Sequence, residues 1–241
     1  AKLQLEQSLD VYDSLGNEAN TSHWLLTSLA YSKVLLDLGD SVKAKEIAQA
    51  VIERRIAEYG LESEKVLKAK YLLSEILAFS YDHEGALELQ REIVDAADAG
   101  VSLSYEFELD ARVSLTGALF LSHVLSGAGD ETRPLLEECL QTIELLVPTI
   151  NKDLGALHPI SIDARLILAS CLMQFKRIEE SIPILEQVYE DATKIYGSNH
   201  YKTAEAAGSL GSIYFYRGIP ESESLLREAI KIYTEVLGAN H

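Results

Sequence analysis

A short phrase recurs along this chain at nearly constant spacing, and it constrains the fold more than any other feature. Its clearest copies are Leu154-Gly155-Ala156-Leu157-His158, Tyr196-Gly197-Ser198-Asn199-His200 and Leu237-Gly238-Ala239-Asn240-His241. The histidines that close these copies are 42 and 41 residues apart. A repeat of this length is typical of a solenoid, in which small units stack on their neighbours instead of surrounding one core. Such a chain presents an extended surface and rarely carries out chemistry.

Each period contains two apolar stripes at helical spacing, joined by a short turn. In the first full unit, one stripe includes Leu35 and Leu36, the turn Leu38-Gly39-Asp40 follows, and the second stripe includes Ala44 and Ile47. Glycine suits the end of a helix, and aspartate caps the start of the next. No segment alternates with the two-residue period of a strand. The sequence therefore predicts an all-α protein built from antiparallel helix pairs.

Small residues recur at one position of each stripe, where two helices must approach closely. In the first helices of the pairs this position holds Ser32, Ser74, Ala169 and Gly211, and in the second helices it holds Ala44, Ala86, Ser181 and Ser222. A large side chain at such a position would force the helices apart.

We predict a right-handed α-solenoid of about eleven helices in a single array over 1–241, beginning with a lone second helix at 2–15. The expected units are approximately 1–16, 17–60, 61–100, 101–155, 156–197 and 198–238. The chain does not start with methionine and ends on the opening of another repeat. We therefore expect a segment of a longer protein with other domains.

The unit at 101–155 is irregular. Its first helix is expected at 102–126, a wider turn at 127–130, and its second helix from Pro134 to about Pro148. This insertion is either a site for a partner, a kink in the superhelix or simple growth of a loop.

Acidic residues outnumber basic residues, and the chain carries a formal net charge of -17. Most of the excess lies at 81–160, where 4 basic and 15 acidic residues give -11. Nucleic acid and anionic membranes are disfavoured as partners, because both are bound mainly through lysine and arginine. The acidic third either keeps the chain soluble or steers a basic partner toward it.

No signal peptide opens the chain, and Cys139 and Cys171 resemble core thiols of a reducing compartment, so we expect a cytoplasmic protein.

Motifs for catalysis, cofactors or metal are missing from the sequence. There is no P-loop, no G-x-S-x-G, no H-E-x-x-H and no paired C-x-x-C. His158, His200 and His241 could be metal ligands, but they lie one repeat apart and would not surround one ion. The alternative is that each caps the start of a helix. We therefore expect no enzyme activity, no cofactor and no metal.

Several short motifs resemble the 42-residue tetratricopeptide repeat of kinesin light chains and of sensor proteins in fungi and bacteria. The matching motifs are Leu154-Gly155-x-x-His158-Pro159, Leu168-Ala169, Glu179-Glu180-Ser181 and Ile195-Tyr196-Gly197-x-x-His200. The resemblance is strongest over 150–241 and implies a fold more than a function. Light chains carry an asparagine pair before Leu-Ala that is similar in role to a clamp on a peptide backbone. This chain has Leu166-Ile167 and Gly208-Ser209 there instead.

In this fold the first helix of each pair faces the concave side, so the register projects a set of candidate groove residues. They are Lys33, Tyr71, Glu75, Phe79, Ile167, Ser170, Met173, Ser212, Phe215 and Tyr216, to which Leu29 and Leu36 and, from the irregular unit, Arg112, Thr116 and His123 can be added. These residues either line a groove for a peptide or helix, or pack against other parts of the protein.

The function predicted from the sequence is a non-catalytic scaffold that holds a peptide or helix of a protein partner in its groove. A partner with basic flanks around an apolar segment would suit both the aromatic residues and the acidic third. The alternative is a regulatory domain of a larger signalling protein that senses a ligand or peptide and changes curvature.

Overall fold

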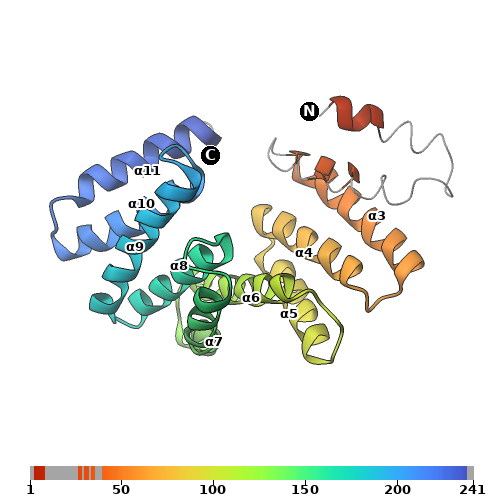
Figure 1. Ribbon diagram of the computed structural model, residues 1–241, viewed down its shortest axis with the longest axis horizontal. Helices are drawn as coiled ribbons and strands as arrows, with labels where there is room; N and C mark the ends of the chain where they lie inside the picture. Colours follow the sequence, from red (N-terminus) through yellow and green to blue (C-terminus); the bar gives the residue numbers. More distant parts are fainter. Residues whose placement is uncertain (1–2, 9–26, 29, 33, 36–39, 238–241) are drawn as a thin grey trace. The chain divides into compact units, whose positions relative to one another are not determined.

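The computed structural model describes residues 3–8, 27–28, 30–32, 34–35 and 40–237, and these are helical apart from turns (Figure 1). Helical residues occur at 3–8 and within 27–35. The helices that follow are α3 (Ser41–Tyr59), α4 (Glu64–Phe79), α5 (His83–Asp98), α6 (Tyr105–Leu125), a 3-10 turn η1 (Asp130–Thr132), α7 (Arg133–Asp153), α8 (Pro159–Gln174), α9 (Ile178–Tyr196), α10 (Tyr201–Arg217) and α11 (Ser222–Leu237). No strand occurs among these residues, so the prediction of an all-α fold is confirmed.

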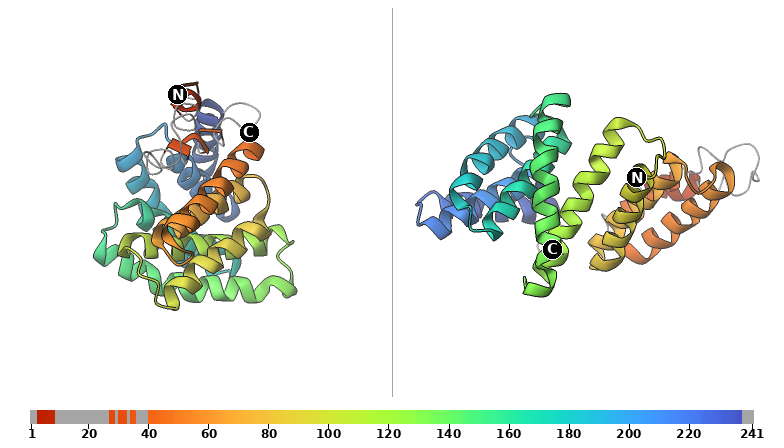
Figure 2. Two further views of the ribbon diagram at one scale, coloured as in Figure 1. Left: turned by 90° about the vertical axis from the view of Figure 1, so that its right-hand side faces the viewer. Right: turned by 90° about the horizontal axis from the view of Figure 1, so that it is seen from below.

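The chain divides into two compact units, 1–122 and 123–241, with the boundary inside α6. In the first unit α3 packs on α4 and α4 on α5, and their core includes Tyr31, Leu35, Ala48 and Ile76. In the second unit neighbouring helices from α7 to α11 pack on one another in sequence order. Short turns reverse the chain between neighbouring helices, as in α8–α9 and α10–α11 (Figure 1), and Figure 2 shows the same helices from two further sides.

Aspartate side chains cap the first turns of α3 and α5, as the turn sequences indicate. The side chain of Asp40 accepts a hydrogen bond from the Lys43 amide at the start of α3. Asp82 does the same for Gly85 at the start of α5, with a distance of 3.1 Å from Gly85 N to Asp82 Oδ1. These bonds satisfy amides that no residue of the helix itself can reach.

Asp82 provides a direct test of this capping. Asp82→Ala should lower the free energy of unfolding by about 1 kcal/mol, because the first turn of α5 loses its acceptor. Asp82→Asn is the matched control, since its amide oxygen can still accept and should retain most of the stability. Urea denaturation followed by circular dichroism measures both changes. Equal losses in the two variants would show that the charge of Asp82, and not its cap, matters.

The small residues of the stripes lie inside, which confirms the register read from the sequence. Ser32, Ala169 and Ser181 are fully buried, and Ser74 and Ser222 are nearly so. Gly211 is also buried, and a methyl group built on it would lie 2.9 Å from Cγ of Leu226 in α11. The helices of each pair are therefore close enough to exclude larger side chains at these positions.

The end predicted for the second helix of the irregular unit is wrong. The sequence placed it near Pro148, whereas α7 continues to Asp153 with Pro148 inside the helix. Proline removes one helical hydrogen bond, but Val147 and Ile150 on either side of it are buried. The burial of these two side chains outweighs the loss of one bond, and Pro148 itself faces solvent.

A buried ion pair that the sequence analysis did not foresee joins α8 to α9. Arg165 Nη1 donates to Asp191 Oδ2 at 2.9 Å, and the two side chains are 7% and 5% exposed. Arg165 also donates to the carbonyls of Ser161 and Ala156, and Gln187 donates to Asp191. The charges thus have hydrogen-bond partners on both sides, as buried charges require.

None of the described helices is long and apolar enough to cross a lipid bilayer.

Candidate functional site

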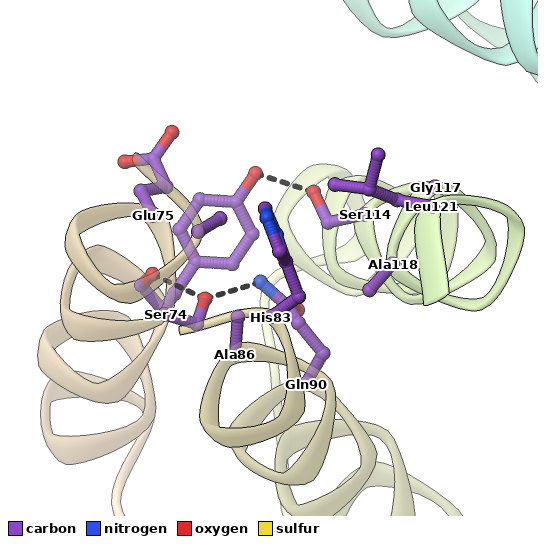
Figure 3. A pocket seen from close by; sticks show the side chains of 11 residues that line it. Ser74, Glu75, His83, Ala86, Gln90, Ser114, Gly117, Ala118 and Leu121 are labelled. Carbon is purple, nitrogen blue, oxygen red and sulfur yellow. Dashed lines mark hydrogen bonds between the residues drawn. The ribbon is translucent and has the colours of Figure 1, made fainter. Parts of the chain in front are cut away.

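A pocket of about 220 Å³ lies among α4, α5 and α6 in the first unit. Its walls come from three helices, and Figure 3 shows the side chains around it. The lining residues are Tyr71, Ser74, Glu75 and Ala78 from α4, His83, Ala86 and Gln90 from α5, and Ser114, Gly117, Ala118 and Leu121 from α6.

Small side chains create the space. Ala78, Ala86 and Ala118 each present only a methyl group, and Gly117 presents none. Ala86 is one of the small residues that let neighbouring helices approach, so the feature that packs the helices also helps to shape the hollow beside them. Leu121 adds an apolar wall from α6.

Polar atoms reach the pocket from its inner side. The amide of Gln90 donates through Nε2 to Ser74 Oγ, and Ser74 Oγ in turn donates to the carbonyl of Tyr71 at 2.7 Å. Gln90 is only 4% exposed, and its carbonyl oxygen Oε1 has no hydrogen-bond partner among the residues that the structure describes. A buried acceptor without a partner favours a ligand that can donate a hydrogen bond.

His83 is the second polar group of the pocket. It occupies the first position of α5, and its ring extends toward the space beside Ser114 of α6 (Figure 3). Its Nδ1 is buried and has no hydrogen-bond partner within the described part of the chain. The ring of Tyr81 meets its ring edge-on, at 6.1 Å between centroids.

Tyr71 ties α4 to α6 at the wall of the pocket. Its hydroxyl lies 2.7 Å from Ser114 Oγ, and its ring meets that of Phe107 edge-on at 5.8 Å. Burial raises the pKa of Tyr71 strongly, and the carboxylates of Asp110 and Glu75 raise it further. The phenol is therefore neutral at any physiological pH, and the surroundings of the pocket are acidic.

The sequence-predicted residues of the first unit differ in where they lie relative to the pocket. Tyr71 and Glu75 both line the pocket, and Phe79 follows on the same face of α4 with 44% of its surface exposed. Arg112 does not line it. Its guanidinium pairs with Asp98 at 2.6 Å and with Glu108 at 2.9 Å. Lys33, Leu29 and Leu36 lie outside the residues that the structure describes.

The placement of Thr116 and His123 on a binding surface is wrong. Thr116 is fully buried and donates to the carbonyl of Val113, and His123 is 3% exposed with its Nδ1 3.0 Å from Thr132 Oγ1. The register of α6 was uncertain in sequence, since apolar residues occupy most of its circumference. Both side chains help to fix local structure instead.

The candidates of the second unit lie on α8 and α10. Ile167, Ser170 and Met173 are half-buried on α8, and Met173 packs against the core of that unit. Ser212, Phe215 and Tyr216 are exposed near the end of α10, with 74% and 70% of the two aromatic side chains accessible.

Among the polar residues that line the pocket, the sequence analysis did not single out His83, Gln90 or Ser114. The sequence places His83 in a short turn between two apolar stripes, and no residue of that turn was expected to have a role. Gln90 gave the one detectable signal, because it is a polar residue at a core position of the stripe that contains Ala86 and Ile93. Ser114 belongs to the helix whose register was unsure.

The histidines of the repeated phrase are helix caps. Nδ1 of His158 accepts from the Ile160 amide at 3.3 Å, and Nδ1 of His200 accepts from the Lys202 amide at 3.2 Å. This confirms the capping role for both, while His241 lies outside the described residues. Within the described ranges, no three His, Cys, Asp or Glu side chains are grouped so that they could hold a metal ion.

Residues 162–235, which include α9, α10 and most of α8 and α11, match the tetratricopeptide repeat family. Among curated protein sequences, none matched the chain.

Solved structures share the fold along most of the chain. A Podosopora anserina protein assigned as a kinesin light chain, with nearly identical TPR-like repeats, has a TM-score of 0.63 and 20% identity over 91% of this chain and 98% of its own. BtubC (BKLC) from P. vanneervenii has a TM-score of 0.55 and 12% identity over 88% and 74%. A Rap protein complexed with Competence and Sporulation Factor has a TM-score of 0.68 and 14% identity over 98% and 63%.

Proposed function

Because residues 162–235 are tetratricopeptide repeats and the described helices before them share the fold, we propose that this chain is a non-catalytic scaffold for a protein partner. We place the contact at the pocket among α4, α5 and α6, where one side chain of a peptide or helix of the partner is held. The single observation that carries this placement is the buried Gln90, which lines the pocket and whose carbonyl oxygen has no hydrogen-bond partner among the described residues.

The size of the pocket supports one side chain as its occupant. Pockets for cofactors and drug-sized ligands usually measure about 300–1,000 Å³, and a dry cavity of about 150 Å³ already holds benzene. At about 220 Å³ the pocket is large enough for a ring or a long stem and too small for most cofactors. Its methyl-lined walls suit an apolar stem, and Gln90 Oε1 suits an N–H or O–H donor at the tip.

The charges around the pocket favour a partner with basic residues. Glu75 stands exposed at the rim, and the carboxylates of Glu75 and Asp110 both act on Tyr71. Negative charges at a rim accelerate the approach of a positively charged partner more than they tighten the final complex. The partner is therefore a basic, apolar-centred protein segment, not nucleic acid or an anionic membrane, and the complex forms in the cytoplasm.

Filling the pocket tests this proposal. Peptides are first selected from a random displayed library against the purified chain, and their affinity is then measured by titration calorimetry. Ala118→Leu should weaken binding at least about tenfold, because the added side chain occupies the hollow and a central anchor contributes about 2 kcal/mol or more. Ala57→Leu, on the exposed side of α3, is the matched control and should leave the affinity unchanged.

A second variant tests the effect of the negative charge at the rim separately from the effect of the pocket's shape. Glu75→Gln should slow association and flatten its dependence on salt, with a smaller effect on dissociation. If Ala118→Leu leaves the affinity intact while Phe215→Ala abolishes it, the peptide binds at α10 and the pocket is not the site.

The alternative function is sensing of a peptide signal within a larger regulatory protein. One observation favours it: the Rap structure that matches 98% of this chain was solved with Competence and Sporulation Factor bound. A sensor should change its radius of gyration in X-ray scattering when a selected peptide is added, whereas a scaffold should keep the same radius.

A further inference from the structure

We propose that Cys139 and Cys171 are a disulfide-forming pair that can reversibly join α7 to α8. The two residues lie 32 positions apart, one in the second helix of the irregular unit and the other in the first helix of the next unit. A bond between them would covalently link two consecutive helix pairs of the repeat array. The proposed binding function uses neither cysteine.

The geometry of the two thiols carries the inference. Cys139 Sγ lies 2.9 Å from Cys171 Sγ, and neither residue is in a disulfide. A disulfide bond measures about 2.05 Å, so the sulfur atoms need to approach by only about 0.9 Å. Both residues are fully buried, which holds the thiols opposite each other between two packed helices.

Burial also sets the conditions under which the bond forms. The hydrogen bond with Cys139 and the loss of solvent both raise the pKa of Cys171, and the charge of Glu144 raises it further. Because the thiolate is the reactive form, the packed protein resists oxidation and the reaction proceeds when α7 and α8 separate briefly. We therefore expect the pair to oxidise slowly in the folded protein.

The reaction balances with a small disulfide such as oxidised glutathione as the oxidant. One cysteine loses its proton and attacks the sulfur–sulfur bond of the oxidant, which forms a mixed disulfide and releases one glutathione thiol. The second cysteine then loses its proton and attacks its partner's sulfur, which closes the protein disulfide and releases the other glutathione. The protein gives up two electrons and two protons, and the oxidant becomes two thiols.

The experiment uses the whole chain, equilibrated with oxidised glutathione under native conditions. Peptide mapping without reductant should recover the fragment that joins Cys139 to Cys171, at one bond per molecule. The bond closes a loop of about 32 residues in the unfolded chain, so the thermal midpoint should rise by about 5–10 °C and return after dithiothreitol.

Cys139→Ala and Cys171→Ala serve as controls and should show no response of the midpoint to oxidised glutathione. The proposal is overturned if the native wild-type chain yields only glutathione adducts, only bonds between molecules, or two unmodified thiols. It is also overturned if the internal bond forms but lowers the midpoint, since the native packing would then oppose the bond. Mapping of the wild-type chain decides the question even if an alanine variant folds poorly.

Discussion

Asp191→Ala is expected to lower the free energy of unfolding by about 3–5 kcal/mol, because it leaves the charge of Arg165 buried without its partner. The side chains of Arg165 and Asp191 are only 7% and 5% exposed, so water cannot replace the lost carboxylate without opening the space between α8 and α9. The two remaining acceptors of Arg165, the carbonyls of Ser161 and Ala156, are neutral and do not compensate its charge.

An exposed pair on α11 provides the matched control for this prediction. Arg227 and Glu223 lie 2.7 Å apart with 76% and 73% of their side chains exposed. Glu223→Ala should change stability by less than about 0.5 kcal/mol, since exposed pairs four residues apart contribute little. Denaturant titration of both variants gives the comparison.

A double substitution distinguishes the pair from the packing around it. Arg165→Met combined with Asp191→Leu should recover most of the stability lost in Asp191→Ala, because two apolar groups of similar volume need no charge partner. If Asp191→Ala costs no more than Glu223→Ala, the pair is solvated in solution and does not stabilise the contact between α8 and α9.

Gly211→Leu should destabilise the chain by about 1–3 kcal/mol or more, through overpacking between α10 and α11. A Cβ atom at this position would lie 2.9 Å from Cγ of Leu226 and 3.1 Å from Cβ of Leu225. The remaining three carbons of leucine have no space unless α11 moves. We expect the thermal midpoint to fall accordingly, as measured by circular dichroism at 222 nm.

Gly208 lies one turn earlier on α10 and should show the opposite effect. A Cβ atom there would meet only Cβ of Ala229, at an ordinary contact distance of 3.7 Å. Gly208→Ala should therefore stabilise the chain by about 0.5–1 kcal/mol, as expected for glycine replaced inside a helix. A loss of similar size in both variants would mean that α10 and α11 pack differently from the arrangement described here.

Much of the fold could be predicted from the sequence because the same pattern of apolar, small and capping residues occurs in several repeats. The helical spacing of apolar residues predicted the helices, and Asp40 and the repeat histidines predicted where they start. The small residues at Ala169 and Gly211 indicated close helix approach, since neighbouring units repeat the same pattern. These features depend on residues near one another in the chain, so one sequence suffices to detect them.

The irregular unit marks where this reasoning failed. The end of α7 was misplaced because the local effect of Pro148 was weighed without the burial of Val147 and Ile150 around it. Thr116 and His123 were assigned to a surface because α6 is apolar around most of its circumference, and periodicity then gives no register. In both cases contacts with other helices decided the outcome.

The sequence by itself determined that this protein is a stack of antiparallel helix pairs without a recognisable catalytic motif. Only the tertiary structure decided which polar residues meet. It brought Gln90 to Ser74, Arg165 to Asp191, and the thiols of Cys139 and Cys171 to within 2.9 Å. The physical reason is that side-chain contacts between helices depend on how whole helices are rotated and how far apart they lie. A small difference in either quantity changes which side chains are in contact.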